Sequence, residues 1–268
     1  MKLNHAFLVL LTVSGREIKK FLRQPGRLLS SVIRPLLWMV VFSAGFTQMT
    51  DLETVIPYDT EHDYRLYLIP GLSLMICLFS GMQSSLAMVY DREMGVMRLL
   101  LTAPLPRSYL LACKLLGGSF LSVLQTIVFL ILVLIWDIGF TFSQLIFILP
   151  FLMVCSLMLT SFGLVLSVYV KQLENFAGTM NFVIFPMFFL STALYPIQRM
   201  QDAGEKWIYL VTSMNPFTHA IETIRYALYY QINLTSFIII ILTTIVFYFI
   251  AVIGYDPQRG LIKRKVVN

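Results

Sequence analysis

The sequence predicts an all-α integral membrane protein with six transmembrane helices. Of its 268 residues, 58% are hydrophobic and only 13% are charged, so too few polar residues are present to cover a water-soluble core. The apolar residues gather in six long stretches, and not in the roughly ten-residue alternating segments of a β-barrel. A charged segment rich in proline separates the second stretch from the third.

The first expected element is an amphipathic helix over residues 5–25, before any span. Apolar residues such as Phe7 and Ile18 recur at helical spacing, basic residues occupy the other side, and Pro25 interrupts the run. Such a helix is suited to lie in the cytoplasmic interface of the membrane. The alternative is a basic anchor that only sets the topology.

The transmembrane spans follow from length and polarity. Crossing a hydrocarbon layer about 30 Å thick takes roughly 20 apolar helical residues. The first stretch is short alone, and the apolar run Leu28–Val32 extends it. The expected spans are Ile33–Phe46, Leu66–Val89, Leu110–Ile135, Leu145–Val170, Phe176–Leu194 and Leu234–Ile253.

Basic residues predict the orientation of these spans. With both termini in the cytoplasm, 16 of the 20 Lys and Arg residues lie on the inner side, as the positive-inside rule requires. The net charge of +6 therefore reflects membrane topology and does not indicate a nucleic-acid partner. The basic residues left on the outer side are Arg65, Arg199, Lys206 and Arg225.

Ionisable residues are nearly absent from the interior of the spans. Arg34 lies near an inner end, from which its side chain can reach the headgroups, and Asp137 lies near an outer end. Buried charges mark ion and proton pathways in membrane proteins. The sequence therefore gives little support to a proton- or sodium-coupled carrier, and it places the energy source outside this chain.

The segment between the second and third spans, residues 91–107, is expected to form a short cytoplasmic helix. Glu93 and Gly95 precede a leucine-rich run, and Pro104 ends it before Arg107 starts the next span. Apolar and charged groups together at the inner membrane surface suit a docking element for a soluble partner. An ordinary connecting loop is the alternative, and spacing alone leaves both open.

The stretch Tyr90–Lys114 resembles the coupling-helix region of the type-2 ABC transporter permeases. The shared pattern is an acidic residue, one further position, glycine, paired leucines, a proline, an arginine and a lysine that opens the third span. Cys113 stands where the family commonly has glycine. The resemblance implies that the residues coupling the chain to an ATPase are Glu93, Gly95, Arg98, Leu99, Leu100, Pro104 and Arg107.

Two other regions resemble the same family. The junction Arg23–Trp38 is similar to that between the interfacial helix and the first span. Residues 195–233 resemble a segment that dips back into the membrane from outside, in which Asn215 is expected to cap a helix and Pro216 to begin it. The residues expected at this outer gate are Asn215, Pro216, Phe217, Ile221, Glu222 and Arg225.

The resemblance implies one permease domain, residues 1–268, that works as a dimer, expected to be a homodimer, in the cytoplasmic membrane of a prokaryote. Two separate ATP-binding subunits are expected to hold ATP and magnesium, because this chain lacks the Gly-x-x-x-x-Gly-Lys-Ser/Thr phosphate loop. No cofactor is expected in the chain itself. The expected activity is export of a hydrophobic or amphipathic molecule, drug-like or lipid, and the alternative is a polysaccharide or glycolipid.

An intramembrane enzyme is the alternative from another class. His219 and Glu222 lie three positions apart, but the second histidine of a His-Glu-x-x-His zinc motif is missing. A structural pair between Glu222 and Arg225 is the arrangement expected at this spacing. Cys77, Cys113 and Cys155 are isolated, so neither a disulfide framework nor a metal site is expected from them.

Overall fold

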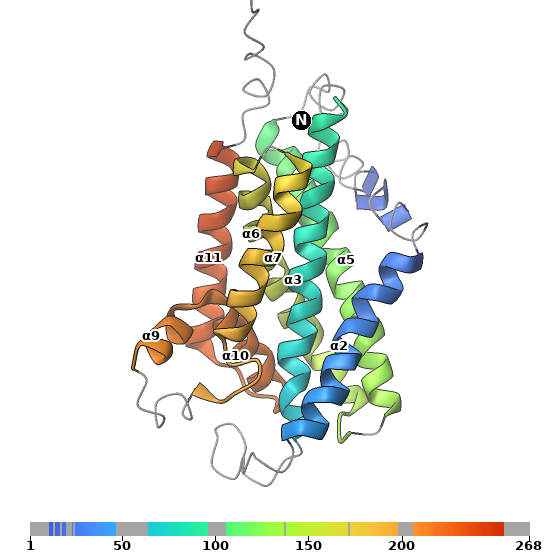
Figure 1. Cartoon of the computed structure of the whole chain (residues 1–268), viewed down its shortest axis with the longest axis vertical. Coiled ribbons are helices and arrows are strands. Elements are labelled where there is room, and N and C mark those ends of the chain that lie inside the picture. Colours follow the sequence, from blue (N-terminus) through green and yellow to red (C-terminus); the bar gives the residue numbers. More distant parts are fainter. Residues whose placement is uncertain are drawn as a thin grey trace, which may run out of the picture.

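A computed structural model describes residues 11–12, 14–16, 18–19, 23, 25–46, 64–95, 106–136, 138–170, 172–197 and 206–254. The regular secondary structure of these residues is helical (Figure 1). The helices are α2 (Pro25–Phe46), α3 (Tyr64–Glu93), α5 (Arg107–Ile135), α6 (Phe142–Tyr169), α7 (Leu173–Phe189), α9 (Lys206–Met214), α10 (Pro216–Leu228) and α11 (Leu234–Gly254).

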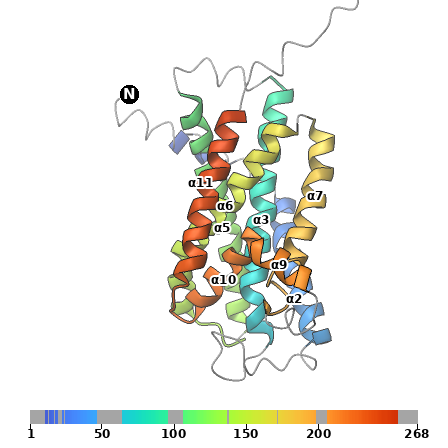
Figure 2. The ribbon, with the colours of Figure 1, turned by 90° about the vertical axis from the view of Figure 1, so that its left-hand side faces the viewer.

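The long helices form one bundle with α3 and α6 at its centre. These two helices pack against each other, and α5 packs against both. Helix α11 covers α6 on one side, whereas α2 and α7 pack against α3 on the other, as the two views show (Figures 1 and 2). The short helix α10 is inserted among α3, α6 and α11.

Four of the described helices are long and apolar enough to cross a membrane: α3, α5 from Ser108 onward, α6 and α11. The apolar part of α2 is the shorter segment Ser30–Gly45. Helix α7 has 17 residues, about 26 Å at 1.5 Å per residue, which is less than the hydrocarbon thickness of about 30 Å. The chain is an all-helical membrane protein in its described part, and the six-span arrangement stays a prediction.

The fifth expected span differs from the helix that forms. The hydropathy pattern places its end near Leu194, but α7 ends at Phe189 and a buried turn follows over Leu190–Leu194. Hydropathy cannot distinguish a helix from a buried turn, because both are apolar. The turn forms here because other helices supply hydrogen-bond donors to its carbonyl groups.

Small residues bring the central helices close together. A Cβ atom added at Gly81 of α3 would lie 3.0 Å from the Cα atom of Thr160 on α6. Between α5 and α6, the Ser156 hydroxyl donates to the Ser119 carbonyl at 3.0 Å, and the Ser119 hydroxyl donates back at 3.4 Å. Such contacts hold helices together in lipid, where apolar side chains gain little by leaving the hydrocarbon.

The outer faces of the bundle are apolar. Helix α11 buries only Ser236, Ile240 and Ala251, and the rest of its surface carries large aliphatic and aromatic side chains. This distribution fits a helix that faces lipid on most of its circumference. The predicted interfacial helix, residues 5–25, and the middle of the predicted coupling helix lie largely or wholly outside the described residues.

Replacing Gly81 with alanine is expected to destabilise the bundle, because its methyl group would meet the backbone of Thr160. Overpacking of this kind costs about 1–3 kcal/mol. Gly178 of α7 is the matched control: an added Cβ there meets no atom within 4 Å, and alanine favours a helix by about 1 kcal/mol over glycine. Thermal unfolding of purified protein in detergent should show a lower midpoint for Gly81→Ala only; equal midpoints would contradict this packing.

Candidate functional site

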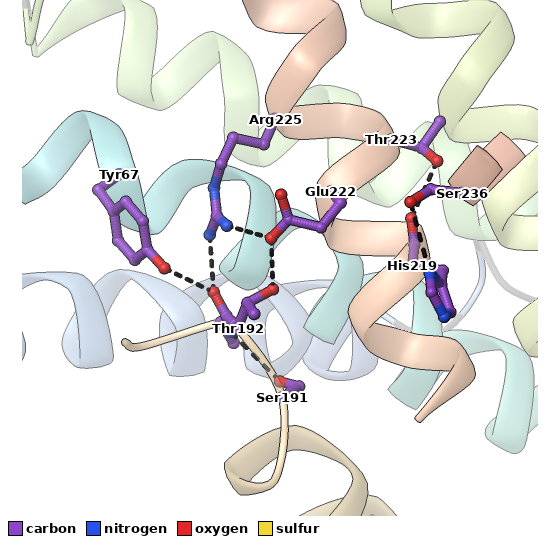
Figure 3. A network of polar contacts seen from close by, with 9 residues as sticks. Tyr67, Ser191, Thr192, His219, Glu222, Thr223, Arg225 and Ser236 are labelled. Carbon is purple, nitrogen blue, oxygen red and sulfur yellow. Dashed lines mark hydrogen bonds and ion pairs between the residues drawn. The ribbon is translucent and has the colours of Figure 1, made fainter. Parts of the chain in front are cut away.

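The turn Leu190–Leu194 after α7 is the centre of a buried polar network. The Thr192 carbonyl accepts a hydrogen bond from the Tyr67 hydroxyl at 3.0 Å and another from Arg225 Nη2 at 2.6 Å (Figure 3). Tyr67 comes from α3 and Arg225 from α10. Two helices therefore meet at one backbone oxygen of the turn.

The end of α7 is held by Asn215, which precedes α10. Its amide nitrogen donates to the carbonyls of Met187, at 2.8 Å, and Leu190, at 2.6 Å. Its side-chain oxygen accepts from the Phe217 amide at 3.0 Å, and Pro216 occupies the first helical position. The predicted cap and helix start are confirmed, and the same side chain closes α7 and opens α10.

Further contacts join the turn to the N-terminal end of α3. The Tyr64 hydroxyl donates to the Leu194 carbonyl at 3.0 Å. Gly71 lies directly against Ala193, where an added Cβ would be 2.9 Å from the Ala193 Cα atom. The turn is thus bonded at several points and closely packed.

The charges of this network are paired. Arg225 binds Glu222 one helical turn earlier, and the Thr192 hydroxyl donates to the same carboxylate oxygen at 2.7 Å. The Arg225 side chain is only 2% exposed, and its Cζ atom lies 4.1 Å from the centre of the Tyr67 ring. A buried guanidinium is costly unless an anion and hydrogen-bond acceptors surround it, and here both are present. The predicted pairing of Glu222 with Arg225 is confirmed.

The two apolar residues expected at the outer gate, Phe217 and Ile221, are fully buried in the core of this chain. Phe217 contacts the ring of Phe188 on α7, with centroids 6.2 Å apart. The structure therefore brings all the expected gate residues together on or next to α10, with the apolar ones facing other helices. Their role as a gate is a proposal.

His219 points away from this network. Its Nε2 atom lies 3.1 Å from the Ser213 carbonyl oxygen, and Nδ1 lies 3.4 Å from the Ser236 hydroxyl oxygen on α11. Glu222 is directed to Thr192 and Arg225 instead, so the two side chains occupy different sides of α10 (Figure 3). His219 and Glu222 do not converge on a shared metal position.

A second cluster surrounds the C-terminal end of α3. Asp91 accepts a hydrogen bond from Lys114 of α5 at 2.9 Å, with both side chains 8% exposed. Arg16 approaches the same carboxylate oxygen at 3.5 Å. This pair ties together the two ends of the segment that contains the predicted coupling helix.

The next residues of α3 contact two further helices. Arg92 donates to the Ser167 carbonyl of α6 at 2.9 Å, and Glu93 accepts from the first amide of α7, that of Leu173, at 3.0 Å. Gly95 then has φ = +71°, a conformation in which glycine ends a helix without strain. The C-terminal end of α3 therefore contacts three helices through consecutive side chains.

Of the other residues predicted to couple the chain to an ATPase, Arg107 begins α5. Arg98, Leu99, Leu100 and Pro104 lie outside the described residues. Sequence reasoning missed Tyr64 and Tyr67, whose spacing of three on one helix face was the available signal. It also missed the contact between Asp91 and Lys114. Both residues lie in the stretch Tyr90–Lys114, which resembles the coupling-helix region, but they are 23 positions apart.

Removing Arg225 is expected to destabilise the protein more than removing the charge of Glu222. Arg225→Met leaves a carboxylate without its cation and the Thr192 carbonyl with one donor fewer, and breaking a buried pair costs about 3–5 kcal/mol. Glu222→Gln keeps an oxygen that can accept from Thr192 and Arg225. Unfolding midpoints of the purified variants should fall in the order wild type, E222Q, R225M; equal midpoints for the two variants would contradict this network.

Comparison with known proteins agrees with these features. Residues 9–229 match the model of the family described as ABC-2 type transporter. The chain is 32% identical over 208 residues to a protein named transport permease ycf38 from Porphyra purpurea, covering 76% of this chain and 68% of that protein. It is 29% identical to the protein of the same name from Cyanophora paradoxa over 211 residues, with the same coverages.

A third relative is the daunorubicin resistance ABC transporter permease protein DrrB1 of Streptomyces coeruleorubidus. It is 24% identical over 217 residues, which cover 80% of this chain and 73% of that protein. Because the family match covers well over half of the sequence, the chain belongs to the ABC-2 type transporter family and is a permease subunit, not the ATPase, of an ABC transporter.

Proposed function

We propose that this chain is the membrane subunit of an ATP-driven exporter that moves a hydrophobic or amphipathic molecule, drug-like or lipid. Permeases of this family pair with ATP-binding subunits. We propose two copies of each subunit, in the cytoplasmic membrane of a prokaryote, with both termini and residues 91–107 on the cytoplasmic side. The observation that supports coupling to the ATP-binding subunits is the position of helix α3. This helix takes part both in the polar network around the turn after α7 and in the cluster around Asp91.

Helix α3 links the two ends of the bundle. Tyr64 and Tyr67 bind the turn after α7 at one end, and Asp91, Arg92 and Glu93 bind three helices at the other. Its 30 residues extend about 45 Å at 1.5 Å per residue. A displacement of residues 91–107 by the ATP-binding subunits is therefore passed to α7 and the turn by a direct chain of contacts.

The proposed six-span arrangement includes α2 and α7. Helix α2 has 22 residues and reaches about 33 Å at 1.5 Å per residue, enough to cross. Helix α7 crosses together with the turn Leu190–Leu194, since a non-helical segment is tolerated at membrane depth where protein groups satisfy its backbone. Residues 195–233 then form the re-entrant segment, and its helix α10 is too short, at 13 residues, to cross.

The proposed substrate class rests on exposed aromatic residues and on one relative. Phe182, Phe185 and Phe189 are exposed on one side of α7, where Phe189 lies 5.8 Å from the ring of Trp38 on α2. A path along this surface suits an apolar molecule better than a glycan. DrrB1, whose name assigns it to resistance against daunorubicin, is similar to this chain over most of its length.

Replacing Glu93 with lysine is expected to uncouple ATP hydrolysis from transport. Lysine cannot accept the Leu173 amide bond and places a positive charge at the start of α7, which separates α3 from α7. The loss of a cap, about 1 kcal/mol, leaves the protein folded. Inside-out vesicles that contain the chain and its ATP-binding subunit should take up daunorubicin on addition of ATP, and E93K should lose this uptake while hydrolysis and protein level persist.

The matched variant is Glu93→Gln, which keeps an acceptor for the Leu173 amide. Uptake close to the wild-type level in E93Q would assign the effect to the hydrogen bond. Normal uptake in E93K would contradict the proposed coupling, and a wild-type protein that hydrolyses ATP with its partner but moves no hydrophobic compound would contradict the substrate class.

If α10 is an outer gate, its buried face is expected to become accessible during the transport cycle. Ala220 is fully buried, and cysteine there adds one small, apolar group. In a background without Cys77, Cys113 and Cys155, a membrane-impermeant thiol reagent should label Ala220→Cys faster with trapped ATP than without nucleotide. Met214, which is 74% exposed, supplies the control position; equal rates at Ala220 in both states would leave α10 as a static cap.

A further inference from the structure

Arg34 is the charged residue in the apolar part of α2. It is the fifth residue of the apolar segment Ser30–Gly45, and its side chain is exposed on the bundle surface. Charges inside apolar segments are rare and costly, and they are usually paired with another group or serve a function. The surroundings of Arg34 show which of these applies.

The buried cations of the described bundle, unlike the exposed Arg34, have carboxylate partners. Lys114 lies 2.9 Å from Asp91, and Arg225 is paired with Glu222. Within the described residues, Arg34 has no such partner. Its Cζ atom lies 4.6 Å from the centre of the Phe79 ring on α3, a cation–π contact that orients the guanidinium but leaves its charge uncompensated.

Arg34 lines a cleft between α2 and α3, which pack side by side (Figure 1). The cleft encloses only about 20 Å³, room for one water molecule, and about 330 Å³ when its open mouth is included, so a larger group lies at the mouth. Its other polar lining groups are the hydroxyls of Ser30, Ser31 and Ser80 and the amide of Gln83, and no acidic side chain lines it among the residues that the structure describes. Its apolar wall is formed by Met75, Ile76 and Phe79.

We propose that this cleft binds the anionic headgroup of an amphiphile, a phosphate or a carboxylate, with Arg34 as its main ligand. A guanidinium presents parallel donors that match the two oxygens of such a group. Hydroxyl and amide groups line the cleft beside the charge, and the neighbouring apolar side chains of Ile33 and Leu37 are exposed on α2, so one molecule can contact both. The assignment of this ligand as the exported substrate or its entry point rests on the proposed export function; the binding itself does not.

The simpler alternative is that Arg34 only extends toward the bulk headgroups at the membrane surface. That arrangement requires neither a specific headgroup nor a particular cation, and a lysine would serve as well. The proposed site instead requires the planar fork of arginine and an anion attached to an apolar tail. These requirements are separable by experiment.

The experiment uses the full chain purified in detergent with its ATP-binding subunit, without ATP. Binding of radiolabelled dioleoyl phosphatidic acid is measured on wild type, Arg34→Gln, Arg34→Lys and the control Arg23→Gln. Arg23 is an exposed arginine just before α2 and outside the cleft. Competition with dioleoylglycerol and with inorganic phosphate tests the headgroup and the tail separately.

We expect R34Q to weaken binding about tenfold, the effect of losing hydrogen bonds to a charged group, with R34K intermediate and R23Q unchanged. Dioleoylglycerol and millimolar inorganic phosphate should compete poorly. The proposed site would be overturned if R34Q bound as tightly as wild type, or if R23Q lost as much affinity as R34Q. Full affinity in R34K would overturn it as well. Complete displacement by inorganic phosphate would show a free-anion site and overturn the assignment to an amphiphile.

Each variant is first checked for a single symmetric peak in size-exclusion chromatography, and R34K serves if R34Q does not fold. Because no nucleotide is added, binding is measured independently of transport. A protein that binds phosphatidic acid through Arg34 but does not export it would contradict the export function alone. A protein that exports daunorubicin without Arg34-dependent binding would contradict this site alone.

Discussion

The turn after α7 sets the main constraint on the half of the bundle that contains α10 and the N-terminal end of α3. Backbone carbonyls buried at membrane depth cannot bind water, and each one left without a donor costs several kcal/mol. Here the donors come from Tyr64 and Tyr67 on α3 and from Asn215 and Arg225 at α10. The positions of α10 and the turn are therefore coupled, because separating them would leave these carbonyls without donors.

Two of the polar contacts at the C-terminal end of α3 differ in strength. Asp91 and Lys114 are both buried, so separating them would leave two uncompensated charges in a poorly polarisable environment. The bond between Glu93 and the Leu173 amide is exposed, where a cap contributes only about 1 kcal/mol. Separating α3 from α5 therefore costs more free energy than separating α3 from α7 at this end.

Local features could be predicted from the sequence, whereas long-range contacts could not. The cap by Asn215, the helix start at Pro216 and the pairing of Glu222 with Arg225 each involve residues within one turn. The contact between Tyr67 and Thr192 spans 125 positions, and hydropathy gives no register for it. The end of α7 was misplaced for the same reason, since the donors that permit the turn lie on other helices.

These contacts indicate that the position of α7 depends little on apolar packing. It buries only Phe176, Ile184 and Phe188, and in lipid even this burial contributes little because the surrounding chains are equally apolar. Its two ends are instead held by side chains, Glu93 at the start and Asn215 at the end. Glu93 belongs to α3 and Asn215 caps α10. A displacement of α3 relative to α10 therefore acts on α7 directly. A helix held at its ends can change its tilt without losing a packed core, whereas α3 and α6 cannot.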